Sequence, residues 1–172
     1  MAPNDGLRTI RDDLLRYEYV FTTSYDLIIY WAMGAGPDGW FLPLVDLFKG
    51  QGLRFDPTNA DPTQGQVPVY FLHGALHLVV GGDGVTWKLR SQLAETVLDQ
   101  FGEPIEGDPQ ARPLLVTEGS SRDKLRAIEG NDYLRHVLER LRVARRAMPR
   151  RMRPRMPMQE KQRRPRPSMT HL

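Results

Sequence analysis

The sequence predicts an α/β fold in which short strands alternate with amphipathic helices. Apolar runs of strand length are separated by segments whose apolar residues recur at helical spacing, and a Gly-rich turn stands between two apolar arms. Of the 172 residues, 40% are apolar and 26% are charged, which is typical of a globular protein. The chain is therefore long enough for one domain with a hydrophobic core.

The N-terminal part is predicted to begin with a helix that leads into a strand. Leucine and isoleucine side chains recur at helical spacing over residues 5–17, and residues 18–22 form a short run of strand type. Residues 27–32 are apolar all round, so we expect that segment to be buried on most sides. The stretch 34–68 is rich in Gly, Pro and Asp and is predicted to be an irregular insertion.

The clearest β signal begins at residue 67. A strand is predicted over residues 67–72, and a hairpin follows whose arms, 76–80 and 85–90, flank a Gly-rich turn at 81–84. In the second arm apolar and polar residues alternate, so one face should be buried and the other solvated. The residues expected on the solvated face are Thr86, Lys88 and Arg90.

The order of strands and helices continues to about residue 142. Apolar spacing predicts a helix over 91–101, a strand over 114–117, and helices over 120–128 and 131–142. We expect residues 1–142 to form the domain. This alternation favours a sheet with flanking helices.

The C-terminal tail differs sharply in composition. Residues 142–172 hold 11 Lys or Arg and one acidic residue, whereas the first 141 residues hold 13 basic and 20 acidic ones. Residues 143–172 contain five Pro, five of the seven Met and no aromatic residue, so we expect a disordered tail. This composition is also typical of an out-of-frame reading of GC-rich coding sequence. An alternative hypothesis is that the tail binds nucleic acid or another polyanion non-specifically, through charge without base stacking.

The composition argues against several classes of protein. The absence of Cys excludes a disulfide framework and a thiolate metal site, and it fits a reducing compartment. No run approaches the roughly 18 to 20 apolar residues of a membrane span, and residues 1–16 are too polar for a secretory signal. We therefore expect a cytoplasmic protein with no membrane partner.

Polar residues follow the first predicted strand. Residues 22–26 read Thr-Thr-Ser-Tyr-Asp, and a strand end followed by a polar turn is where α/β sheets hold ligands. The alternative is a helix cap, with Thr23 as the N-cap residue and Asp26 as its partner three residues on. The residues alone leave both interpretations open.

His73 follows the next strong strand and precedes Gly74. A histidine there has the right pKa for a general base near neutral pH, although many histidines in such places are structural. A zinc site with His77 is not expected, because the two residues would lie about 13 Å apart in an extended strand and no Cys completes the ligand set. We therefore predict no metal.

Gly119 and Ser120 form a turn between a predicted strand and a predicted helix. Free backbone N–H groups at the start of that helix are suited to a phosphate. Equally, Ser120 and Asp123 have the spacing of a capping box, which needs no ligand.

Taken together and in this order, these segments resemble the bacterial domain-of-unknown-function 4917 family, which is similar to sirtuin-like NAD hydrolases. The resemblance covers roughly residues 13–141. The segments that carry it are 20–26 (VFTTSYD), 70–77 (YFLHGALH), 116–121 (VTEGSS), 124–125 (KL) and 131–134 (NDYL).

The resemblance implies a Rossmann-like, sirtuin-like sheet that binds NAD, with His73 acting on the ribose hydroxyls during cleavage of the nicotinamide glycosidic bond. Ser24 stands where active relatives commonly have Asn, and a hydroxyl cannot reproduce the donor and acceptor of an amide. NAD binding is therefore expected to survive better than hydrolysis. The residues implied to bind the cofactor are Thr23, Ser24, Asp26, Gly119 and Ser120.

The chain also departs from the family pattern. It lacks the initial strand with its Gly-rich phosphate loop and a further strand after residue 142, so we expect an incomplete sheet, a truncated copy and weak NAD binding. A further hypothesis is a chain that does not fold stably, because exposed sheet edges favour aggregation. The zinc-binding Cys module of sirtuin deacylases is absent, which argues against deacylation.

Overall fold

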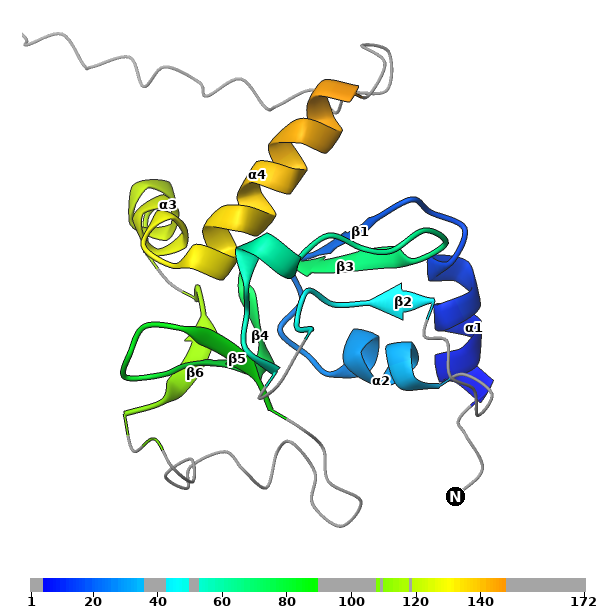
Figure 1. Ribbon diagram of the computed structural model, residues 1–172, viewed down its shortest axis with the longest axis horizontal. Helices are drawn as coiled ribbons and strands as arrows, with labels where there is room; N and C mark the ends of the chain where they lie inside the picture. Colours follow the sequence, from blue (N-terminus) through cyan, green and yellow to red (C-terminus); the bar gives the residue numbers. More distant parts are fainter. Residues whose placement is uncertain are drawn as a thin grey trace, which may run out of the picture.

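A computed structural model describes residues 5–35, 43–49, 53–89, 108, 110–117 and 119–147. Within these ranges, short strands alternate with helices, and the predicted α/β class is confirmed at this level (Figure 1). The elements, in order, are α1 (Asp5–Leu14), β1 (Val20–Thr22), α2 (Ile28–Gly34), β2 (Leu44–Val45), a 3-10 turn (Pro57–Asn59), β3 (Val67–Phe71), β4 (Gly74–Val80), β5 (Thr86–Lys88), β6 (Arg112–Leu115), α3 (Ser121–Glu129) and α4 (Asp132–Ala147).

The described strands form two small sheets. β1, β3 and β2 make a parallel sheet with β3 in the centre, and β5, β4 and β6 make an antiparallel sheet with β4 in the centre. Figure 1 shows α1 and α2 beside the parallel sheet, while α4 crosses the region where the two sheets meet. None of the described helices is long and apolar enough to span a membrane.

Two residues, Leu72 and His73, connect the end of β3 in the parallel sheet to the start of β4 in the antiparallel sheet. Gly74 has a φ of +81°, and a Cβ built on it would lie 1.8 Å from the carbonyl oxygen of Leu114. Only glycine both adopts this φ readily and lets β6 approach so closely. The glycine after His73 is therefore required by the junction itself.

The hairpin predicted around residues 81–84 is confirmed, but the solvated face predicted for its second arm is not. Gly81 N–H donates to Val85 O at 3.0 Å, and β5 pairs antiparallel with β4. Thr86 is 3% exposed and Lys88 is half-buried, because α4 and the segment after β2 cover the face expected to be solvated. Arg90 lies outside the described residues.

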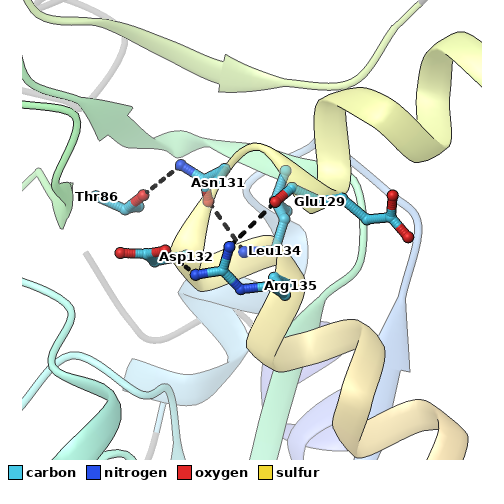
Figure 2. Close-up of polar contacts among 6 residues, drawn as sticks. All are labelled: Thr86, Glu129, Asn131, Asp132, Leu134 and Arg135. Carbon is cyan, nitrogen blue, oxygen red and sulfur yellow. Dashed lines mark hydrogen bonds and ion pairs between the residues drawn. The ribbon is translucent and has the colours of Figure 1, made fainter.

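Asn131 anchors the start of α4 to this hairpin (Figure 2). Its side-chain oxygen accepts the Leu134 N–H at 3.0 Å, and its amide nitrogen donates to Thr86 Oγ1 at 2.9 Å. One side chain thus satisfies a free N–H of the helix and also joins the helix to β5. Arg135 closes the same turn by donating to Glu129 O at 3.2 Å and pairing with Asp132.

Two predictions about residues 27–68 are wrong. Ile28 is 45% exposed and Trp31 is 44% exposed, so α2 packs through one face only, with Ala32 and Met33 buried. The stretch 34–68 also contributes β2 to the parallel sheet. Its two residues pair with β3, a contact that their short apolar run did not predict.

Other boundaries differ by a few residues. α1 ends at Leu14, and β6 begins at Arg112, earlier than the predicted strand. α4 continues to Ala147, so residues 143–147 are helical instead of belonging to the predicted tail. The helix predicted over 91–101 and residues 148–172 lie outside the described residues.

The main core lies where α4 packs against β3. Its largest fully buried side chains include Tyr133, Phe71 and Leu134. The Phe71 N–H donates to the Tyr133 phenol oxygen at 3.1 Å, on the side of β3 where β2 has already ended. Tyr133 therefore satisfies a backbone donor that none of the described strands reaches.

Candidate functional site

The first two predicted segments lie side by side at the carboxyl ends of β1 and β3. The Leu72 N–H donates to Thr22 O at 2.9 Å, and the Leu76 N–H donates to Tyr25 O at 3.0 Å. β1 and β3 are parallel, so both polar turns emerge at the same edge of the sheet. His73 and the segment 22–26 therefore share one edge, where α/β sheets commonly hold ligands.

The third segment joins them through the end of β6. The Val116 N–H donates to His73 O at 2.9 Å, and the Tyr25 hydroxyl donates to Val116 O. Residues 25, 73 and 116 are thus connected by backbone and phenol hydrogen bonds. The structure brings together segments that are up to 91 residues apart in the sequence.

His73 is half-buried in this junction. Its ring lies 6.3 Å from the Tyr25 ring, measured between centroids. Burial lowers the pKa of His73, and the positive charge of Lys124 lowers it further. The imidazole is therefore mostly neutral at pH 7, the form that accepts a proton. None of the described residues hydrogen bonds to its ring nitrogens.

Ser24 and Asp26 interact with each other and with the start of α2. The Ser24 hydroxyl donates to Asp26 Oδ2, and the Ile28 N–H donates to Asp26 Oδ1 at 2.8 Å. The capping box proposed for Thr23 and Asp26 is not formed, because Leu27 is the N-cap residue of α2 and no side chain caps it. Thr23 is exposed at the same edge.

The Ser120 and Asp123 capping box is present at the start of α3. The Asp123 N–H donates to Ser120 Oγ at 3.3 Å, and the Ser120 N–H donates to Asp123 Oδ2 at 3.1 Å. Hydrogen bonds from the Ser120 side chain and backbone lower the pKa of Asp123. Gly119 precedes this cap with a φ of +107°. A carboxylate thus occupies the helix start where a phosphate was expected, and the phosphate role of Gly119 and Ser120 stays a prediction.

A cavity of about 820 Å³ lies elsewhere, between α1, α2 and the segment around β2. None of the six predicted site residues lines it. Its wall includes a partly buried ion pair between Lys88 and Asp46, at 2.5 Å. The sequence did not reveal this pair, because residue 46 falls in the stretch predicted as an insertion. The described residues contain no group of three or more His, Asp or Glu that could hold a metal ion.

Comparison with known proteins identifies the family of the chain. A family model described as "Domain of unknown function (DUF4917)" matches residues 3–148, which include every described helix and strand. No curated protein matches the sequence significantly. The match covers most of the chain, and the chain therefore belongs to the domain of unknown function family DUF4917.

Proposed function

We propose that this chain binds an NAD-type dinucleotide at the edge formed by the ends of β1, β3 and β6, with His73 as the base. The observation that supports this most is the hydrogen bonding of three separate polar segments around one half-buried, neutral histidine. Pockets at the carboxyl ends of parallel strands are the usual ligand sites of α/β sheets.

Three groups in this junction match the chemistry of the ribose, the aromatic rings and the pyrophosphate of an NAD-type dinucleotide. The neutral imidazole accepts a proton from a ribose hydroxyl. The Tyr25 ring beside it offers an aromatic face to a nicotinamide or adenine ring. Lys124 contributes a positive charge close enough to lower the His73 pKa, and the same charge favours a pyrophosphate.

Binding, more than hydrolysis, is the activity that these residues favour. In hydrolysis, the bond between the ribose C1′ and the nicotinamide nitrogen breaks and nicotinamide leaves with the bonding electron pair. A water oxygen bonds to C1′, and that water gives up one proton to the solvent. Ser24 is held by Asp26 and lacks the carbonyl oxygen and amide group of an asparagine. We therefore expect slow nicotinamide release, and a faster release from Ser24→Asn, whose amide restores both functions.

Calorimetric titration of NAD into the full chain tests this proposal. Saturable binding in the micromolar range is expected. His73→Ala should weaken it about tenfold or more, because a hydrogen bond in the site is lost. His136→Ala is the matched control, since His136 is half-buried on α4, and it should bind as the unchanged chain does. A cooperatively folded sample that gives no binding heat, or equal binding by His73→Ala, would reject the proposal.

A second candidate function, polyanion binding, is favoured by the end of α4. Its last turns carry the exposed residues Arg142, Arg145 and Arg146, which lead into the basic C-terminal stretch. Each phosphate neutralised should contribute close to one unit to the slope of log affinity against log salt. Deleting residues 148–172, which leaves α4 intact, should reduce salt-dependent DNA retention. Retention that the deletion leaves unchanged would exclude the tail as the binding segment.

A further inference from the structure

The cavity beside β2 has the size of a small-molecule site. Its volume of about 820 Å³ lies within the roughly 300 to 1,000 Å³ of typical ligand pockets. It is bounded by α1, α2, β2, the segment that follows β2, and Lys88 of β5. The site proposed around His73 is separate, because none of the cavity-lining residues belongs to it.

Most of the cavity wall is apolar and partly aromatic. Rings of this kind favour a flat apolar ligand, through burial and stacking. The Tyr30 ring is held in place from behind, since it stacks on the buried His77 ring at 4.4 Å between centroids. The principal apolar side chains of the wall are Leu7, Tyr30, Trp31, Leu44, Phe48 and Leu53.

One polar feature interrupts this wall, the ion pair between Lys88 and Asp46. The Asp46 side chain is 7% exposed and that of Lys88 is 18% exposed. Asp46 Oδ2 accepts from Lys88 at 2.5 Å, and Oδ1 accepts the Phe48 N–H at 3.2 Å. Both oxygens of the carboxylate are therefore occupied.

The Lys88 ammonium has N–H donors beyond the one that bonds to Asp46. An ammonium group carries three N–H donors, and Asp46 is its one acceptor among the described residues. Because Lys88 is half-buried, an acceptor that enters the cavity can take up these remaining donors. Lys49 also lines the cavity, but it donates to Asp61 O. The wall is thus matched to an anion with an apolar body.

We infer that this cavity binds a small aromatic carboxylate, whose ring packs against Tyr30, Trp31 and Phe48 and whose carboxylate accepts from Lys88. The ion pair with Asp46 holds the Lys88 ammonium at the wall. The inference stands independently of the NAD site, because the two sites share no residue.

Two soluble probes that differ in charge test this inference. 1-Naphthylacetate carries the carboxylate, and 1-naphthylacetamide presents the same ring with a neutral amide. Titration of each into the full chain, followed by calorimetry, should show the acid binding about tenfold more tightly, the size of a charge-assisted hydrogen bond. Equal affinity for the two probes, or no binding of the acid, would overturn the inference.

Two variants locate the binding. Lys88→Met combined with Asp46→Asn removes both charges together, so no buried charge is left unpaired. It should bind acid and amide equally. Gly34→Phe adds a ring at a lining position where a Cβ meets no atom within 4 Å. Because that ring takes up ligand space, it should weaken binding of the acid about tenfold.

Ala127→Phe is the matched control, because Ala127 is exposed on α3 and does not line the cavity. It should bind the acid as the unchanged chain does. A persistent preference for the acid in the double variant would refute the role of Lys88. Unchanged binding by Gly34→Phe would place the ligand outside the cavity and contradict the inference.

Discussion

His77 should make the fold sensitive to mild acid. Its side chain is fully buried between the Tyr30 and Phe71 rings, at 4.4 Å and 4.8 Å between centroids. Neither ring nitrogen has a hydrogen-bond partner in the part of the chain that the structure describes. Burial, and to a lesser extent the charge of Lys88, lowers the pKa of His77 to about 3. The folded chain therefore holds this imidazole neutral at pH values where the unfolded chain protonates it.

The size of the effect follows from the two pKa values. Because the folded pKa lies below the unfolded value of about 6.5, stability is full above pH 6.5 and is lost as the pH falls toward 3. Between pH 7 and pH 5 the loss from His77 alone is about 2 kcal/mol. At pH 5 the folded form is still almost entirely neutral, so this figure depends mainly on the unfolded pKa.

Urea unfolding at pH 7 and pH 5, followed by circular dichroism, measures this loss. His77→Phe keeps an aromatic ring in the stack and removes the titrating group, so the unchanged chain should lose about 2 kcal/mol more than this variant between the two pH values. Burial also lowers the pKa values of His73 and His136, and the difference between the two proteins cancels their contributions. An identical pH dependence in the two proteins would show that the burial of neutral His77 does not contribute to the acid sensitivity.

Two further substitutions test the junction and the core. Gly74→Ala should abolish the cooperative thermal unfolding transition, because its Cβ would collide with the Leu114 carbonyl. Gly84→Ala is the control, since Gly84 has a φ of +80° with open space around it, and it should lower the free energy of unfolding by only about 1 to 2 kcal/mol. Equal losses of stability in the two variants would contradict the close approach of β6 to Gly74. Tyr133→Phe leaves the Phe71 N–H unpaired and should lower the free energy of unfolding by about 1 to 3 kcal/mol in urea, with the m-value unchanged. A loss within the error of that measurement would show that the bond contributes little.

Features fixed by neighbouring residues were predictable from the sequence. The turn at 81–84 and the capping box of Ser120 and Asp123 depend on residues at most four apart, and both are present. The Thr23 and Asp26 cap failed although it is equally local, because Asp26 accepts the N–H two residues on instead. Local motifs therefore indicate a possible contact, and competition between nearby donors decides which one forms.

Features that depend on distant segments were not predictable. Alternation placed Thr86 in solvent, yet Asn131, 45 residues later, covers it. β2 has only two residues, and its pairing with β3 gives no periodic signal. The order of the motifs suggested a shared site. Only the folded chain shows that the Tyr25 hydroxyl donates to Val116 O. It also shows that the charge of Lys124 lowers the pKa of His73.

NAD binding beside His73, as we propose, can be observed at the imidazole itself. The measurement is nuclear magnetic resonance of the histidine rings of the full chain at pH 7, recorded during a titration with NAD. The His73 ring signals should shift saturably, while those of His136, on α4, should stay in place. His73 signals that stay unchanged at a high concentration of NAD would contradict binding at this site.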